Sequence, residues 1–182
     1  PRSTLFPYTT LFRSVATAWC DAAEGNEVVE VRSWSALQRA VTGADGYELV
    51  HHAGHIGRAV DRGPGVLLED GYHSAREFLA EVAKARPEVV FLNGCESLGE
   101  TVQSESGERV PGVLDAVRAS GLRAVIGTLW PVAPPDTRFV EVFYRAYAHR
   151  VEGAESLRRA RAAVVGVDSW ARGWPADVMW GG

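Results

Sequence analysis

The chain has 182 residues, of which 46% are apolar and 23% charged, and its formal net charge is −4. This size and balance fit one folded domain and exclude a disordered chain or two domains with full cores. The acidic balance argues against a nucleic-acid surface, and no apolar run approaches the roughly 20 residues that span a bilayer. With only two cysteines, Cys20 and Cys95, the chain is no disulfide scaffold, and a reducing, cytoplasmic compartment is expected.

The first fourteen residues differ in character from the rest of the chain. The sequence begins with Pro1 rather than Met, and Thr4 to Ser14 spell TLFPYTTLFRS, which resembles the in-frame translation of a DNA-sequencing adapter. We therefore expect residues 1–14 to be a non-native segment and residues 15–182 to be a domain that lacks its own first strand. The alternative is a genuine strand, because Leu5 to Phe12 has enough β-propensity to occupy a strand position.

From Val15 onward, short β-branched runs alternate with helical stretches, which predicts βαβ units and a parallel sheet. Strands are expected at residues 28–31, 47–52, 88–92 and 124–128. Helices are expected at 33–41, from Ser74 to before Pro87, from Pro111 to Gly121, from Asp136 or Thr137 through Tyr147, and at 154–165. Ser74 and Glu77 have the spacing of a capping box, and the polar stretch from Glu96 to Val110 is expected to be a long loop.

Two of these strands are followed by chemically active side chains. His55 comes after the strand that ends at His52, and Cys95 comes after the strand that ends at Leu92. Because sites in open parallel sheets form beyond the carboxyl ends of the strands, we expect His55 and Cys95 to face one crevice if their strands are neighbours. An imidazole there would activate the thiol, and the backbone N–H groups of Ile56 and Cys95 would stabilise an oxyanion.

Other interpretations of the same residues remain open at this point. Cys95 is equally consistent with a small buried apolar residue. A metal site at His51, His52, His55 and Cys95 is disfavoured, because strand alternation sends the first two side chains to opposite faces. The glycines around His55 lack the G-x-G-x-x-G spacing of a dinucleotide loop.

Four segments in order resemble the CHAT family, bacterial caspase-like domains often found beside TPR repeats. They are HHAGH at 51–55, LLEDG at 67–71, NGCES at 93–97 and IGTLWPV at 126–132, and the later FY at 143–144 and SLRRA at 156–160 also fit. The resemblance runs from about Val28 to Trp180. It implies a three-layer caspase-like α/β fold, with a mostly parallel sheet flanked by helices, which we expect to be truncated at both ends.

The resemblance also implies a function, hydrolysis of peptide bonds by a Cys–His dyad without metal or cofactor. Cys95 is then the nucleophile and His55 the general base, while Asp70, Glu96 and Trp130 either line a substrate pocket or orient His55. The expected partners are a protein or peptide substrate and a TPR or other sensor domain in the full-length bacterial protein, with neither nucleic acid nor membrane involved.

One departure from the family pattern keeps other functions open. Ile56 follows His55 where the family usually has glycine, and a β-branched residue disfavours positive φ. An inactive caspase-like scaffold for protein docking is therefore the alternative function. A small-molecule hydrolase that uses the same dyad is a third.

Overall fold

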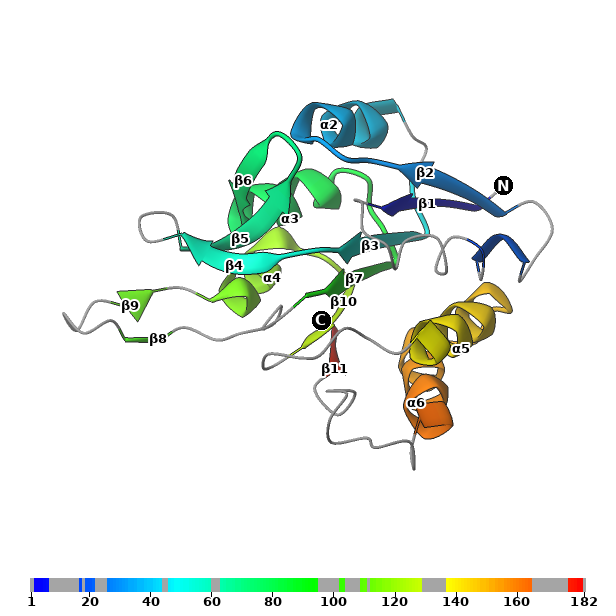
Figure 1. The fold of residues 1–182 in the computed structure, drawn as a ribbon. Helices are drawn as coiled ribbons and strands as arrows, with labels where there is room; N and C mark the ends of the chain where they lie inside the picture. The colour runs from blue at the N-terminus through cyan, green and yellow to red at the C-terminus, as the bar shows by residue number, and fades with distance from the viewer. Residues whose placement is uncertain are drawn as a thin grey trace.

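The structure is a computed structural model that describes residues 2–6, 17, 19–21, 26–43, 46–59, 63–94, 102–103, 109–110, 112–128, 137–164 and 177–181 (Figure 1). Its strands are β1 (Arg2–Phe6), β2 (Asn26–Glu30), β3 (Leu49–Ala53), β4 (Ile56–Ala59), β5 (Gly63–Leu68), β6 (Gly71–Ser74), β7 (Val89–Asn93), β8 (Val102–Gln103), β9 (Arg109–Val110), β10 (Ala124–Thr128) and β11 (Asp177–Gly181). Its helices are α2 (Trp34–Gly43), α3 (Ala75–Ala83), α4 (Val113–Ser120), α5 (Thr137–Ala148) and α6 (Gly153–Val164).

A six-stranded sheet with the order β11-β10-β7-β3-β1-β2 organises the fold, and only the pairing of β10 with β11 is antiparallel. Strands β3, β7 and β10 are buried along their whole length, as expected for interior strands of a parallel sheet that is covered on both faces. The pairing of Leu49 with Val89 through Ala53 with Asn93 makes β3 and β7 direct neighbours. The carboxyl ends of these two strands therefore lie at one edge, which is where His55 and Cys95 are expected to meet.

The strands at the two ends of the chain bear on the expected truncation. Arg2–Phe6 forms β1, between β2 and β3, so part of the segment expected to be non-native occupies an interior position of the sheet. Asp177–Gly181 forms β11 on the free side of β10. The non-native origin of residues 1–14, and the missing strands at both ends, stay predictions.

Helices cover both faces of the sheet, which confirms the three-layer α/β architecture (Figure 1). Helices α2, α3 and α4 pack on one face, where Val50, Val90 and Leu92 point. Helices α5 and α6 pack on the other face, where Leu49 and Phe91 point, because successive strand residues face opposite sides. The first four of these helices bury the following side chains: Leu37, Val41, Phe78, Leu79, Val82, Val113, Leu114, Val117, Phe139, Phe143 and Tyr147.

Two smaller sheets were not expected from the sequence. Between β3 and α3 the chain forms an antiparallel sheet of β4, β5 and β6, in a stretch for which the sequence predicted no element. Within the stretch expected to be a long loop, β8 and β9 pair over two residues each. The rest of that stretch, from 96 to 101 and from 104 to 108, lies outside the described residues.

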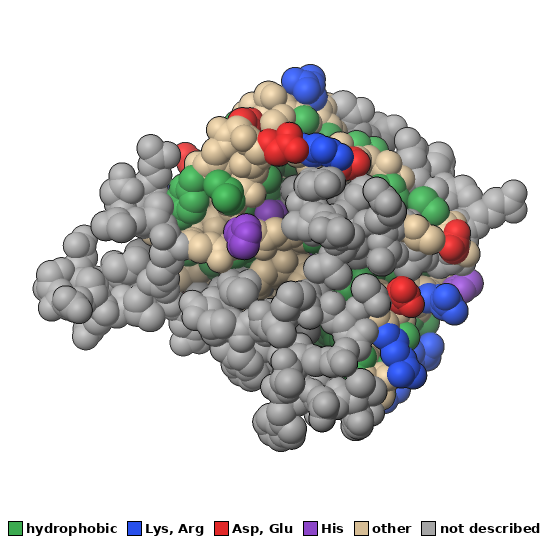
Figure 2. Space-filling view, in the orientation of Figure 1, with side chains coloured by type: hydrophobic (Ala, Val, Ile, Leu, Met, Phe, Trp, Pro, Cys, Tyr) green, Lys and Arg blue, Asp and Glu red, His purple; other side chains and the backbone are tan. Residues whose placement is uncertain are grey.

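Charged side chains of both signs are exposed on the described surface. On the face seen in Figure 2, acidic and basic side chains are interspersed, and the blue side chains at the lower right lie over the α5 and α6 region. Within the described residues, no helix is both long enough and apolar enough to cross a membrane.

The ends of two helices confirm the predicted capping. Ser74 precedes α3, its hydroxyl oxygen accepts the backbone N–H of Glu77 at 3.3 Å, and the Glu77 carboxylate accepts the N–H of Ser74 at 3.1 Å. Gly121 ends α4 in the left-handed region, with φ of 70°, a conformation that glycine adopts without a steric penalty. The capping box fixes the point at which the chain leaves β6 and enters α3.

We expect Ser74→Ala to lower the free energy of unfolding by about 1 kcal/mol, because two backbone N–H groups at the start of α3 lose their side-chain partner or its support. Urea denaturation at neutral pH measures the change. Ser74→Thr retains a hydroxyl at the same position and is the matched control, expected to lie within a few tenths of a kcal/mol of the wild type. Equal stability of the alanine and threonine variants would contradict this role for the cap.

Candidate active site

His55 lies on an exposed turn between β3 and β4, held by main-chain hydrogen bonds on both sides. The N–H of Gly54 donates to the carbonyl oxygen of Asn93 at 3.3 Å, which ties the turn to the end of β7. The carbonyl oxygen of His55 accepts the N–H of Leu67 at 3.1 Å, which ties it to β5. The backbone of His55 is thus fixed between the main sheet and the small sheet, while its imidazole is open to solvent.

Gly94, the residue before Cys95, lies directly against this turn. A Cβ atom at Gly94 would stand 2.7 Å from the carbonyl oxygen of Gly54 and 2.8 Å from Cγ1 of Ile56, closer than such atoms can approach. The hydroxyl of Thr128, at the end of β10, donates to the carbonyl oxygen of Gly94 at 2.6 Å. The residues that precede His55 and Cys95 are therefore in close contact at the carboxyl edge of the sheet.

Three of the predicted site residues, Cys95, Glu96 and Trp130, lie outside the described part of the chain. The distance from the Cys95 sulfur to the His55 ring therefore stays a prediction.

Ile56 begins β4, where its half-buried side chain packs against the core. Among the described residues other than glycine, positive φ occurs only at Arg86 and Arg150. Ile56 therefore adopts an ordinary backbone conformation, and its N–H remains a candidate oxyanion donor.

His51 and His52 point to opposite faces of β3, as strand alternation predicts. The His51 ring lies among Phe91 and Tyr144, and its Nδ1 forms a hydrogen bond with the Tyr144 hydroxyl. The His52 ring contacts Phe78 on the other face and lies beneath Gly54, where a Cβ would stand 3.1 Å from its Cε1 atom.

Burial keeps both of these histidines neutral. It lowers the pKa of His51 to about 3, with a further decrease from His52. Burial is also the main reason that the pKa of His52 is lowered to about 4. Neither ring is open to a substrate, so they are structural groups beneath the His55 turn. In the described part of the chain, no group of three His, Cys, Asp or Glu side chains is arranged to hold a metal ion.

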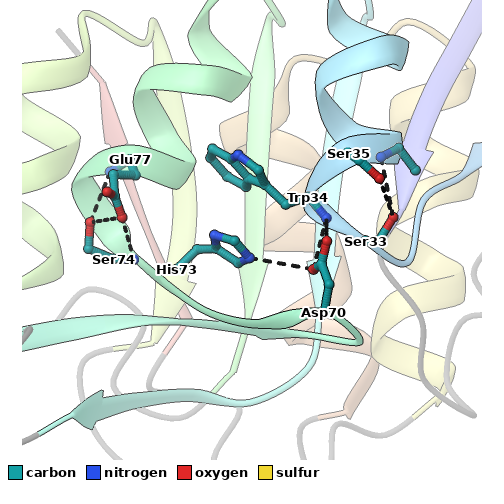
Figure 3. A network of polar contacts seen from close by, with 8 residues as sticks. Ser33, Trp34, Ser35, Asp70, His73, Ser74 and Glu77 are labelled. Atoms are coloured by element: carbon teal, nitrogen blue, oxygen red, sulfur yellow. Dashed lines mark hydrogen bonds and ion pairs between the residues drawn. The ribbon is translucent and has the colours of Figure 1, made fainter.

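Asp70 occupies the turn between β5 and β6, where its contacts are to α2 (Figure 3). Both carboxylate oxygens accept the N–H of Trp34, the first residue of α2, at 3.0 and 2.8 Å. His73 Nε2 lies 3.4 Å from Asp70 Oδ1, and the His73 ring stacks on Trp34 with ring centroids 4.5 Å apart. The carboxylate thus caps α2 from a distant part of the sequence, and a role at the active site stays a prediction for Asp70.

Sequence reasoning missed the residues that position the two loops. Thr128, Gly94 and Gly54 carry no catalytic signal alone, although glycines beside both His55 and Cys95 are a usable sign of close backbone approach. The opposite, amino edge of the sheet carries a surface cavity of about 470 Å³, where Glu48, Glu88 and Arg123 precede β3, β7 and β10. That cavity is separate from the His55 edge.

Comparisons with known proteins were made on both sequence and structure. The model of the CHAT domain family matches residues 18–178. The crystal structure of the Arg-specific cysteine proteinase gingipain R is similar, with a TM-score of 0.64, 10% identity, and coverage of 99% of this chain and 46% of that one. The Saccharomyces cerevisiae separase–securin complex gives a TM-score of 0.59 and 18% identity, over 98% of this chain and 11% of that one.

The chain thus spans less than half the length of these two proteins, and the likeness to them shows the fold alone. This likeness confirms the expected fold class. A comparison with curated proteins found no significant match.

We expect Gly94→Ala to lower the free energy of unfolding by about 1–3 kcal/mol, because the new methyl group overlaps the Gly54 carbonyl and Ile56. Gly57→Ala is the matched control, since a Cβ at Gly57 meets no atom within 4 Å and no positive φ is needed there. Chemical denaturation of the two variants gives the comparison. A Gly94→Ala protein as stable as Gly57→Ala would show that the two loops are not in contact.

The Asp70 cap predicts a specific dependence of stability on pH. The pKa of Asp70 is lowered, mainly because its carboxylate accepts the N–H of Trp34. The contribution of this carboxylate to stability is therefore present above the ordinary carboxyl pKa of about 3.9, and it is lost as the pH falls through the lowered pKa. Asp70→Asn cannot titrate there. Between pH 6 and pH 2.5 we therefore expect wild type to lose more unfolding free energy than Asp70→Asn, as measured by urea denaturation. Parallel losses would contradict the cap.

Proposed function

The chain belongs to the CHAT domain family, and from that premise we propose that it is a cysteine endopeptidase with Cys95 as nucleophile and His55 as general base. The observation that carries the proposal is the contact of Gly94 with Gly54 and Ile56. It holds the residues next to the proposed nucleophile and base together at the carboxyl edge of neighbouring strands, where sites in such sheets form. The caspase-like cysteine protease fold supports the same reaction class.

The proposed reaction proceeds through an acyl-enzyme. His55 accepts the proton of the Cys95 thiol, and the thiolate attacks the carbonyl carbon of the scissile peptide bond. The backbone N–H groups of Ile56 and Cys95 stabilise the oxyanion that forms. His55 then donates its proton to the departing amine, and a water molecule, deprotonated by His55, hydrolyses the thioester. Of the three histidines in β3 and the turn after it, His51 and His52 are buried and His55 is exposed. His55 is therefore the one that can perform these proton transfers.

Membership of the family supports a proposal about the full-length protein. We infer a bacterial, cytoplasmic regulatory or defence protein in which a TPR or other sensor domain controls the peptidase. Glu96 and Trp130 are proposed to line the substrate pocket, because each follows a strand that ends at the His55 edge. Asp70 is proposed to support the site from further away, by holding the β5–β6 turn against α2.

A second candidate function is an inactive scaffold for protein docking. It is favoured by one observation: the Ile56 side chain, where the family usually has glycine, packs against Gly94 beside the proposed nucleophile. In this alternative the caspase-like fold is retained while Cys95 is an unactivated thiol.

Thiol alkylation separates the two functions. Cys20 is exposed, so its thiol would also react with the alkylating reagent. Cys20→Ser is therefore made first, to remove this background labelling. A free thiol is only a few per cent thiolate at neutral pH, so activation by His55 can accelerate iodoacetamide labelling of Cys95 by roughly tenfold or more. We expect His55→Ala to remove that acceleration, and His149→Ala, which changes an exposed histidine near the end of α5, to keep it.

The peptidase function further requires cleavage of a denatured protein substrate, such as casein, that Cys95→Ala abolishes. Slow labelling of Cys95 that is the same with and without His55, in a protein whose circular dichroism shows it to be folded, would favour the scaffold. Fast, His55-dependent labelling with no cleavage of protein but hydrolysis of small esters would favour the small-molecule hydrolase instead.

A further inference from the structure

The small sheet of β4, β5 and β6 has two faces of different character. One face carries Ile56, Val66 and Leu68, which pack into the core cluster beneath α3. The opposite face carries Leu67 and Tyr72, which are cross-strand partners. The N–H of Leu67 donates to the carbonyl of His55, so this pairing continues to His55 itself. His55, Leu67 and Tyr72 therefore form one row across the outward face of the small sheet.

Leu67 is the unusual member of this row. Its side chain is 53% exposed, and it is the large hydrophobic side chain that the described part of the chain leaves exposed. Its neighbours on the strand, Val66 and Leu68, are both buried, so the exposure follows from the outward direction of position 67. A single exposed leucine is ordinary on a protein surface. Leu67 differs from such a leucine because its backbone pairs directly with that of His55, the proposed general base.

Tyr72 is held in a fixed position beside Leu67. Its hydroxyl donates a hydrogen bond to the carbonyl oxygen of Gly63. Its ring lies across Gly65, where a Cβ would stand 2.7 Å from the ring atom Cζ and from the hydroxyl oxygen. Gly65 is thus required for the ring to lie flat on the strand, and the half-buried ring extends the apolar surface of Leu67.

We propose that Leu67, flanked by the Tyr72 ring, is a specificity-determining residue that selects peptides with a large apolar side chain within two residues of the scissile bond. The proposal rests on the proposed peptidase function, because it takes His55 to act at that bond. Cross-strand partners have Cβ atoms about 5 Å apart, and alternate side chains of an extended peptide recur about every 6.6 Å. A substrate side chain that reaches Leu67 therefore lies within two positions of the bond at His55.

The chemistry of the subsite determines the class of substrate. Apolar side chains such as Leu, Ile, Met and Phe would remove Leu67 from water on binding, whereas a charged side chain there would lose hydration without gaining a partner. The nearest carboxylate turn, Glu69 and Asp70, is directed to Arg32 and Trp34 instead. The subsite thus selects by apolar contact and leaves the charge of other substrate positions to other residues.

The test uses fluorogenic peptide libraries in which one position at a time is fixed as Leu, Phe, Ser, Glu or Lys. For the wild type, we expect Leu or Phe to be preferred over Ser at one position within two residues of the cleaved bond. Leu67→Glu should reduce that preference roughly tenfold and favour Lys there, while Leu67→Met should keep it. Ala80→Glu is the matched control, because it adds the same charge at an exposed position of α3 and should leave the preference unchanged.

The outcomes separate this subsite from the peptidase function itself. Cleavage that depends on Cys95 and His55 but shows no apolar preference, or the same preference in Leu67→Glu, would overturn the subsite and leave the peptidase in place. If no peptide is cleaved, the same labelled peptides are tested for binding to Cys95→Ala by fluorescence anisotropy. Tighter binding of the Leu than the Ser peptide, abolished by Leu67→Glu, supports the subsite, and equal binding overturns it.

Discussion

The close approach of Gly94 to the turn between β3 and β4 is the constraint on which the candidate site depends. Two glycine backbones meet where a single methyl group would not fit, and the Thr128 hydroxyl fixes the carbonyl of Gly94 from a third strand. Strands β3, β7 and β10 are neighbours in the sheet, so this contact joins all three at one edge. The contact between Gly94 and Gly54 is made by backbone atoms, so many changes of side chain elsewhere would leave it intact.

The alternation of β3 assigns different roles to three histidines that lie close together in the sequence. His51 and His52 are enclosed between the sheet and the helices on either side, and burial keeps them neutral over the physiological range of pH. His55 follows the turn and faces solvent. A proton-transfer role requires access as well as an imidazole, and access is what distinguishes His55 from its two neighbours.

The sequence alone predicted β2, β3, β7 and β10, the five helices and the capping box at Ser74, because each depends on local periodicity or spacing. The resemblance to the CHAT family implied the helices on both faces, and β1 and β11 were not among the expected strands. It did not predict β4, β5 and β6, since glycine and proline at positions 63–65 are signals of a loop when considered locally. The cap that Asp70 places on α2 joins residues far apart in the sequence and carries no local pattern. The dyad was inferred from strand ends and from the resemblance to the CHAT family. Of it, His55 and the contact between Gly54 and Gly94 lie within the described chain, and Cys95 does not.

The turn between β5 and β6 is attached to the rest of the domain at several points. Glu69 donates its N–H to the carbonyl of Arg32, Asp70 caps α2, and Ser74 begins α3. These anchors involve the backbone of Glu69 and the side chains of Asp70 and Ser74, so outward positions such as Leu67 are not part of them. Related sequences can therefore diverge at those outward positions without loss of the fold, and selectivity would evolve there faster than the architecture that supports it.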